Sequence, residues 1–183
     1  MPVFRKPKAP ESPLIVSVTG VRLGMRVVGI VGQDARLFFE IARRVGLTGR
    51  AMALAQDEQD ATAIGDAAIA DGVTLDVASP YLPLTVPDGS LDLVIVDERA
   101  PRPASYELAV LLPHVRTALR QGGRALVVLP AGGLLARWLG TTRPPDVRPV
   151  LDAFLAAGLS KGRLVAAYDG LAFVEAIRPG EPS

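Results

Sequence analysis

Polar residues that could carry out chemistry follow three short apolar segments of the chain. Asp97 and Glu98 end the segment "LDLVIVDE". Asp57 follows "AMALAQ", and Gln33 and Asp34 follow "VVGIVG". A carboxylate at the end of a strand can act as a base toward a substrate or hold the hydroxyl groups of a ribose. Asp97 is the best placed catalytic candidate, although paired acids at strand ends are also common as solvated loop residues.

The composition excludes several kinds of catalytic and metal site. The chain contains no Cys, which rules out thiolate nucleophiles, disulfides, iron–sulfur clusters and Cys-based zinc sites. Its one histidine, His114, excludes a metal centre with several His ligands. Because His114 lies in a helical pattern away from any strand end, we expect it to be structural or exposed. The sequence predicts no metal site.

Charge and hydropathy restrict the surroundings in which the chain works. The 20 basic and 19 acidic residues are scattered and give a net charge of +1, which argues against nucleic acid as a partner. No stretch approaches the roughly 18 apolar residues that a membrane span needs. The start of the chain is charged and rich in proline, without the apolar core of a secretory signal. These features predict a cytoplasmic protein without a membrane or nucleic-acid partner.

Strand and helix patterns alternate along the chain. Short apolar segments predict strands over residues 25–31, 49–55, 73–77, 91–97 and 124–130, then a hairpin over 163–179 that turns at Asp169 and Gly170. Amphipathic or Ala-rich patterns predict helices over residues 34–46, 57–72, 104–123, 132–140 and 146–158. Near-continuous apolar strands separated by helices indicate a mostly parallel sheet covered on both faces. We therefore predict one three-layer α/β domain over 14–183, preceded by a flexible basic, Pro-rich arm over 1–13.

Local signals place the ends of two of these helices. Asp34 is expected to cap the start of the helix after the first strand, and Gly46 to end it. Gly122 and Gly123 are expected to end the helix before the fifth strand. Ligands of such a sheet bind where the strands end, so the polar residues named first are expected to gather at one edge.

Several blocks of this sequence resemble the class I S-adenosylmethionine-dependent methyltransferases, most closely those that act on small molecules. "VPDGSLDLV", followed further along the chain by "RQGGRALVV", is typical of that family, and "GMRVVGIV" and "GLAFVEAIRP" also fit it. The resemblance covers residues 14–178. It implies a Rossmann-like sheet of seven strands, mostly parallel with an antiparallel terminal strand, and S-adenosylmethionine as the cofactor.

The positions that the resemblance assigns to the cofactor carry other residue types here. In the family, the first strand ends in an acid that is followed by three spaced glycines. The acid position is Gly29, and the glycine positions are Val31, Gln33 and Ala35. Val31 is β-branched and disfavours the positive φ that a glycine adopts freely. The acid that ends the second strand and holds the ribose corresponds to Ala55.

The stretch that contacts adenine in the family is replaced as well. Its usual Gly-Asp-Ala corresponds to residues 79–81, which end in Tyr81. The scaffold blocks therefore match the family while the positions that face the ligand do not. The groups that remain available to contact the cofactor are Gly29, Gly32, Gln33, Asp34, Gln56, Asp57 and Tyr81.

Two hypotheses of function follow from this pattern. The first is a methyltransferase-like pseudoenzyme in which S-adenosylmethionine binding is weak or lost, acting as an interaction or regulatory module through a protein partner or a second copy of itself. The alternative is a divergent but active methyltransferase of a small-molecule acceptor, with Gln56 or Asp57 on the ribose. In that family, catalysis consists mainly of positioning the methyl donor against the acceptor, so few fixed catalytic residues are needed.

A dinucleotide-binding enzyme is a weaker third interpretation. Gly29, Gly32 and Ala35 spell G-x-x-G-x-x-A before a helix, and Asp57 could serve as the acid on the ribose. An imperfect glycine pattern is a weak signal by itself, and the terminal hairpin favours the methyltransferase-like interpretation.

Overall fold

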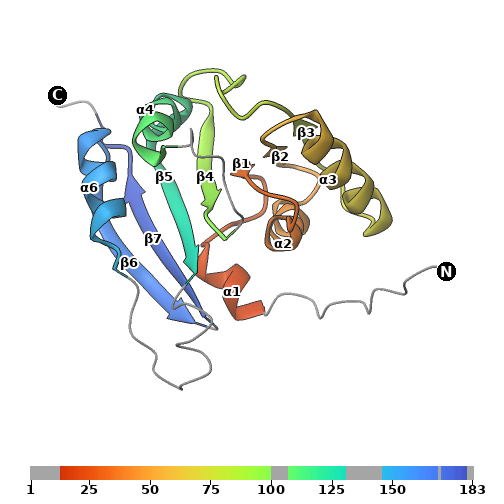
Figure 1. The fold of residues 1–183 in the computed structure, drawn as a ribbon, viewed down its shortest axis with the longest axis horizontal. Coiled ribbons are helices and arrows are strands. Elements are labelled where there is room, and N and C mark those ends of the chain that lie inside the picture. The colour runs from red at the N-terminus through yellow and green to blue at the C-terminus, as the bar shows by residue number, and fades with distance from the viewer. Residues whose placement is uncertain (1–12, 100–106, 131–145, 169, 181–183) are drawn as a thin grey trace.

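A mixed β-sheet forms the centre of the protein (Figure 1). The computed structural model describes residues 13–99, 107–130, 146–168 and 170–180. The strand order is β3-β2-β1-β4-β5-β7-β6. The strands are β1 (Arg26–Ile30), β2 (Arg50–Leu54), β3 (Asp76–Ala78), β4 (Leu91–Asp97), β5 (Leu119–Pro130), β6 (Ser160–Tyr168) and β7 (Leu171–Ile177). The helices are α1 (Pro13–Val18), α2 (Arg36–Val45), α3 (Glu58–Ala70), α4 (Leu108–Ala118) and α6 (Arg148–Ala156).

The strand directions confirm the predicted seven-stranded sheet. β1 pairs in parallel with β2 and β4, and the pairs β2–β3 and β4–β5 are parallel as well. β7 runs antiparallel to β5 and to β6, so the terminal strand breaks the parallel order. The fold is the predicted three-layer α/β sandwich with a Rossmann-like sheet.

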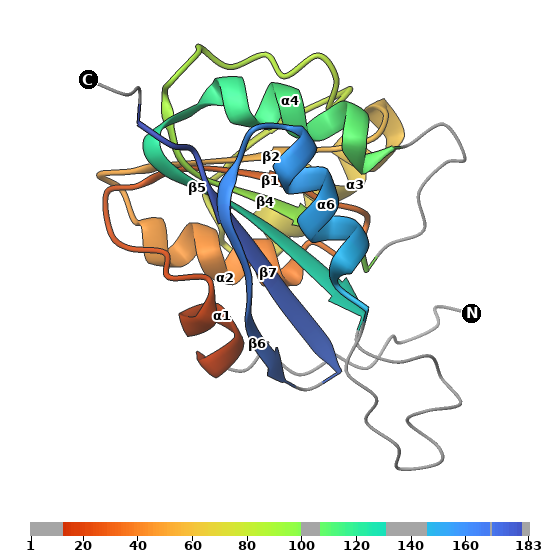
Figure 2. The same cartoon turned by 90° about the vertical axis from the view of Figure 1, so that its left-hand side faces the viewer.

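Helices cover both faces of this sheet (Figure 2). α1, α2 and α3 share one buried apolar cluster with Val27 and Val31. α4 and α6 share a second cluster, on the other face, with Val28 and Ile30. Successive side chains of a strand point to opposite faces, which is why neighbouring apolar residues of β1 belong to different clusters.

The helix before β5 is shorter than predicted. The sequence predicted a helix over 104–123 that ends at Gly122 and Gly123, but α4 stops before Leu119, where β5 begins. The backbone of Leu119 is extended, and this residue pairs with Leu91 of β4. Gly123 lies within the strand, where a Cβ would come 2.9 Å from the carbonyl oxygen of Leu91. Pairing with β4 therefore decides where the helix ends, and Gly123 permits a close approach of the two strands.

The third strand begins later than the predicted 73–77, because a helix cap takes up the first of those residues. Gly72, which follows the C-cap Asp71 of α3, adopts a φ of +65°. Its N–H donates to the carbonyl oxygen of Ile69 at 3.0 Å, and the N–H of Val73 donates to that of Ala68 at 2.8 Å. This is the hydrogen-bond pattern of a Schellman cap, which buries an apolar residue after the glycine.

Part of the prediction lies outside the described residues. This applies to the arm up to residue 12, the helix over 132–140, and Asp169 of the terminal turn. α1, which begins at Pro13, is a short helix that the sequence patterns did not predict. Among the helices that the structure describes, none is long and apolar enough to cross a membrane.

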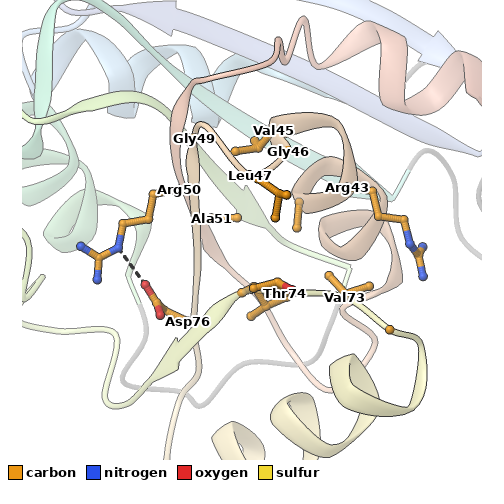
Figure 3. A pocket seen from close by; sticks show the side chains of 13 residues that line it. Arg43, Val45, Gly46, Leu47, Gly49, Arg50, Ala51, Val73, Thr74 and Asp76 are labelled. Atoms are coloured by element: carbon orange, nitrogen blue, oxygen red, sulfur yellow. Dashed lines mark hydrogen bonds and ion pairs between the residues drawn. The ribbon is translucent and has the colours of Figure 1, made fainter.

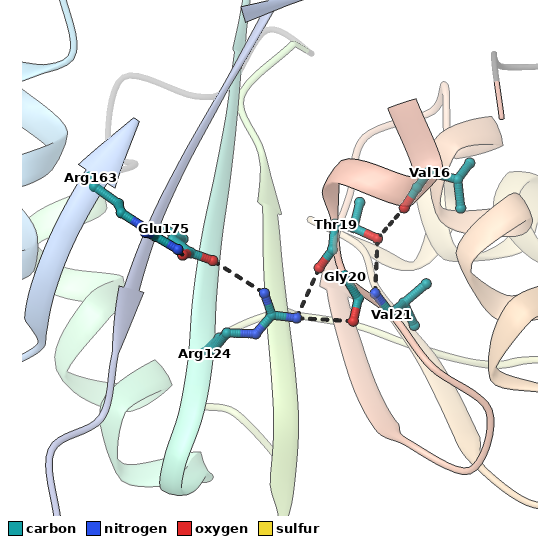
Figure 4. Close-up of polar contacts among 7 residues, drawn as sticks. All are labelled: Val16, Thr19, Gly20, Val21, Arg124, Arg163 and Glu175. Carbon is teal, nitrogen blue, oxygen red and sulfur yellow. Dashed lines mark hydrogen bonds and ion pairs between the residues drawn. The ribbon is translucent and has the colours of Figure 1, made fainter. Parts of the chain in front are cut away.

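A buried ion-pair network joins the end of α1 to the antiparallel strands (Figure 4). Glu175 of β7 is 4% exposed and accepts hydrogen bonds from Arg124 Nη1 at 3.1 Å and Arg163 Nη2 at 2.7 Å. Arg124 also donates to the carbonyl oxygens of Thr19 and Gly20, at 3.0 and 3.2 Å. Because these two carbonyls directly follow α1, Arg124 holds this helix against the sheet.

Asp92, at the start of β4, is held by two arginines of neighbouring strands. Its carboxylate accepts from the backbone N–H of Arg26 at 2.8 Å and from Nε of Arg120 at 2.6 Å. Partial burial acts to raise the pKa of Asp92. The two hydrogen bonds and the positive charges of both arginines outweigh this effect, and they hold its pKa below the ordinary value of 3.8.

We expect Asp92→Asn to destabilise the protein at neutral pH and to have less effect in acid. A carboxylate whose pKa is lowered by folding contributes stability above its ordinary pKa, and this contribution disappears as the pH falls through the folded-state pKa. Urea unfolding of the parent and the variant, measured from about pH 7 to about pH 2, tests this. The stability difference should shrink in acid, whereas a constant difference would show that the Asp92 charge contributes nothing.

Candidate functional site

The turn after β1 lies at the carboxyl edge of the sheet, where ligands bind in this architecture. The N–H of Val31 donates to the carbonyl oxygen of Leu54 at 3.1 Å, so Val31 continues the pairing of β1 with β2. Its side chain is 3% exposed and lies in the cluster beneath α2. Lys161 is the one non-glycine residue with a positive φ in the described part of the chain. Val31 therefore has a backbone conformation that a β-branched residue adopts without strain.

Gly29 of β1 is packed against the ring of Phe38 in α2. A Cβ atom built on Gly29 would lie 2.8 Å from Cγ of Phe38 and closer still to two other ring carbons. Real Cβ atoms essentially never come within 3.0 Å of another heavy atom. Phe38 is 1% exposed and has core residues around it. This position therefore has no room for a carboxylate side chain unless the phenylalanine moves.

Gln33 and Asp34 use their side chains for contacts within the protein. Gln33 Nε2 donates to Oδ1 of Asp60 at 2.9 Å, which joins this turn to the start of α3. The Asp34 carboxylate accepts from Nε and Nη2 of Arg36 at 2.7 and 2.5 Å. The prediction that Asp34 caps α2 is wrong, because the N-cap is Ala35 and no side chain caps this helix. The Asp34 carboxylate contacts the Arg36 guanidinium instead of the backbone N–H groups of the first turn.

Gln56 and Asp57 follow β2 at the same edge of the sheet, and both are exposed. Oδ1 of Asp57 accepts from the backbone N–H of Asp60 at 2.8 Å, so Asp57 is the N-cap of α3. Ala55, at the position of the ribose-binding acid in the resembling family, is completely buried. Its N–H donates to the carbonyl oxygen of Ala78 at 2.9 Å, which continues the pairing of β2 with β3.

Asp97 ends β4 and is 4% exposed. Its Oδ1 accepts from Nε of Arg99 at 2.8 Å, and its Oδ2 accepts from Nη2 at 2.6 Å. The backbone N–H of Arg99 donates to Oδ1 as well, at 3.1 Å. Glu98 is partly buried, and its N–H donates to the carbonyl oxygen of Val128 at 2.9 Å. A guanidinium thus engages both oxygens of the carboxylate that the sequence favoured as a catalytic base.

Tyr81 lies in the loop between β3 and β4 and packs on the other side of the sheet from Phe38. It is partly buried against the apolar cluster under α4 and α6. Phe38 and Val31 belong to the cluster under α2. Gly32, partly buried, follows Val31 in the turn after β1.

The sheet register brings the predicted strand ends together. Ile30 pairs with Leu54 of β2 and with Val96 of β4, so the turns after these three strands meet at one edge. The sequence predicted this meeting, since the carboxyl ends of neighbouring parallel strands always share an edge.

Three residues that shape this edge were missed by sequence reasoning. Phe38 looks like an ordinary core residue of an amphipathic helix, and Asp60 like one of several acids in the first turn of α3. Arg99 gave the one available signal, since it lies two residues after Asp97 in a loop that leaves a strand.

The described residues contain no group of three or more His, Asp or Glu side chains that could hold a metal ion. Two cavities lined by them, each of about 350 Å³, lie at the opposite edge of the sheet, one where β2 and β3 begin and the other where β1, β2 and β4 begin.

Comparisons with known proteins find similarity in structure but none in sequence. The sequence matches no protein-family model and no curated protein. A SAM-dependent methyltransferase from Aquifex aeolicus has a TM-score of 0.68 at 17% identity, over 90% of this chain and 87% of that one. A chain in the complex of the Haloferax volcanii Trm112 methyltransferase activator and a putative methyltransferase has a TM-score of 0.65 at 16% identity, over 93% and 89%. The [4+2]-cyclase SpnF has a TM-score of 0.63 at 14% identity, over 91% and 79%.

The similarity to these neighbours extends over about nine-tenths of this chain. At such low identity the likeness concerns the fold, and functions differ among proteins that share one. The chain has the fold of the class I S-adenosylmethionine-dependent methyltransferases.

Proposed function

We propose that this protein is a non-catalytic, methyltransferase-like module in which S-adenosylmethionine binding is weak or lost. The packing of Gly29 against Phe38 carries the proposal. In the family, an acid at this position anchors the ammonium group of the cofactor. Here the phenylalanine ring takes the volume that such a side chain would need, and the surrounding core fixes the ring.

Three of the polar side chains at the carboxyl edge make contacts within the protein. Asp57 caps α3, and Gln33 bonds to Asp60 in the first turn of the same helix. Asp97 is paired with Arg99. A ligand would have to compete with each of these contacts, so every one of them reduces the affinity that the edge can offer.

A module without a catalytic role acts through association, and we propose a protein partner or a second copy of this chain. One solved structure with a similar fold comes from a complex with a Trm112 methyltransferase activator. Because the fold in that complex is contacted by another protein, it supports a role in protein association for this chain.

The second candidate is a divergent but active methyltransferase of a small-molecule acceptor. The exposure of Gln56 and Asp57 at the carboxyl edge favours it. The cap of α3 uses Oδ1 of Asp57, and a carboxylate has further acceptor positions for ribose hydroxyls. Positioning of donor and acceptor could then supply most of the catalysis.

Calorimetric titration with S-adenosylmethionine and S-adenosylhomocysteine decides between the two. The proposal predicts no heat of binding up to millimolar ligand. This result corresponds to a binding free energy of less than about 4 kcal/mol. A Kd near 1 μM, which is a binding free energy of about 8 kcal/mol, would overturn the proposal and justify a screen for methyl acceptors.

If binding is found, Asp57→Asn tests the enzyme interpretation without removing the helix cap. Asn caps a helix about as well as Asp, so the variant should stay folded while losing the carboxylate. Loss of a charge-assisted bond to the ribose should raise the Kd at least several-fold. An unchanged Kd would exclude Asp57 as the ribose ligand.

A further inference from the structure

A cavity of about 350 Å³ lies where β1, β2 and β4 begin, at the edge of the sheet opposite to the candidate cofactor site. It is at the small end of the range for sites that hold small molecules, about 300 to 1,000 Å³. Its apolar lining comes from three strands and the loop before β4, and it includes Val28, Met52, Val86 and Leu91. Its polar lining consists of three hydroxyl groups and two guanidinium groups: Thr48, Thr85, Ser90, Arg26 and Arg50.

The two arginines are direct neighbours across a parallel strand pair. Arg26 of β1 is in register with Arg50 of β2, and both are exposed. Side chains two residues apart on a strand share a face of the sheet. Arg26 and Arg50 therefore point to the same face as Val28 and Met52, which line the cavity. Like charges directly opposite each other are unfavourable, and a bound anion would remove this repulsion.

Neighbouring carboxylates neutralise this pair only in part. Arg50 forms an ion pair with Asp76 at 2.7 Å, and Figure 3 shows its side chain reaching toward that residue. Asp92 pairs with Arg120 and accepts the backbone N–H of Arg26. The Arg26 guanidinium itself forms no ion pair within the described residues. These residues thus carry three guanidinium groups, those of Arg26, Arg50 and Arg120, and two carboxylates, those of Asp76 and Asp92.

The outer wall of the cavity is fixed by hydrogen bonds. The N–H of Gly89 donates to the carbonyl oxygen of Thr117 in α4 at 2.9 Å, which attaches the loop before β4 to the helix. Ser90 Oγ donates to the carbonyl oxygen of Pro87 at 2.6 Å and keeps its own acceptor positions. The cavity is thus a formed part of the fold, bounded by strands on one side and an anchored loop on the other.

We propose that this cavity binds a small organic oxyanion, a phosphate or a carboxylate on a compact apolar body. The guanidinium groups of Arg26 and Arg50 hold the charged oxygens, since arginine matches the geometry of both groups. The apolar body lies against Val28, Met52 and Leu91. The site is independent of the cofactor edge, because it lies at the other end of the same strands.

Calorimetric titration of the full chain with phenyl phosphate, benzoate and inorganic phosphate tests this. We expect phenyl phosphate or benzoate to bind at least ten-fold more tightly than inorganic phosphate, because inorganic phosphate has no apolar part. The tighter of the two aromatic anions assigns the anionic group. No measurable binding of either aromatic anion, or equal binding of all three probes, would overturn the proposal.

Variants of single arginines assign the site. Arg26→Gln and Arg50→Gln should each weaken the tighter probe at least five-fold. Arg44→Gln is the matched control, since Arg44 is an exposed arginine of α2 outside this cavity and should leave the Kd unchanged. Arg26→Gln keeps its backbone N–H for Asp92, and circular dichroism confirms that each variant is folded. Equal affinities in the Arg26 and Arg44 variants would show that binding occurs elsewhere.

Discussion

Gly29→Asp, which restores the acid found at this position in the resembling family, is expected to unfold most of the protein. The new Cβ would overlap the Phe38 ring, and overpacking of a core costs about 1 to 3 kcal/mol. A carboxylate without a partner at this buried position adds several kcal/mol more. The sum of these two costs approaches the free energy of unfolding of a whole domain, about 5 to 15 kcal/mol. Urea unfolding followed by circular dichroism measures the loss.

Gly29→Ala keeps this prediction measurable if the aspartate variant does not fold. It should lower the free energy of unfolding by about 2 kcal/mol through the Cβ alone. Gly65→Ala is the control, because a Cβ on Gly65 meets nothing within 4 Å in α3 and should stabilise the helix by about 0.5 to 1 kcal/mol. Equal effects of the two substitutions would contradict the role assigned to Phe38.

A double variant ties the effect to the phenylalanine ring. Phe38→Leu alone should destabilise the protein by leaving a cavity. Combined with Gly29→Ala, the total loss should fall short of the sum of the two single losses by about 1 kcal/mol or more, since the smaller side chain makes room for the new Cβ. Strict additivity would show that Gly29 and Phe38 do not share that volume.

The stability of the variants at Gly29 and Phe38 bears directly on the proposed function. If Gly29 accepts an acid only after Phe38 is removed, then loss of the cofactor acid and gain of core packing are one structural change. Recovery of S-adenosylmethionine binding would then require changes in the core as well as in the turn. An aspartate tolerated at position 29 would instead favour the enzyme interpretation.

Arg124→Met is the second substitution for which we expect a large effect. It leaves the buried Glu175 with Arg163, whose side chain is 70% exposed, and removes the donors to the carbonyl oxygens after α1. Removing one partner of a buried ion pair costs about 3 to 5 kcal/mol, because the remaining charge loses its compensation. We expect about 3 kcal/mol, since Arg163 still compensates part of the charge. Urea unfolding provides the measurement.

Arg163→Met is the matched control, because it removes an arginine from the same carboxylate. The Arg163 side chain is 70% exposed and the buried Glu175 keeps its bond from Arg124, so this variant should lose less than the Arg124 variant, about 1 kcal/mol. Similar losses in the two variants would mean that the burial of Arg124 and its bonds at the end of α1 add nothing. Hydrogen exchange of the α1 amides should rise in the Arg124 variant and stay unchanged in the control.

The repeating patterns of the sequence determined the fold. Apolar strands such as "LDLVIVD" and amphipathic helices such as "RLFFEIARRV" need a covered sheet to bury their apolar faces, and this requirement is written into residue spacing. The edge at which Gln33, Asp57 and Asp97 gather follows from the same pattern. These inferences depend on periodicity, which neighbouring residues along the chain define.

Element ends depended on contacts that the sequence does not display. Gly122 and Gly123 favour a helix end locally, yet the pairing of Leu119 with Leu91 ends the helix earlier. Asp34 favours a helix cap locally, yet Arg36 takes its carboxylate. In the first case a neighbouring strand overrides the local signal, and in the second a neighbouring side chain replaces the backbone of the helix as the partner of the acid.

The sequence by itself determined which chemical groups this protein has and which it lacks: no Cys, a single His, and no acid at Gly29 or Ala55. Only the tertiary structure decided what those groups contact. It placed Phe38 over Gly29, Asp57 at the start of α3, Arg99 on Asp97, and Arg26 beside Arg50 at the opposite edge. Composition belongs to the chain, whereas volume and charge pairing arise between segments that meet only when the sheet forms.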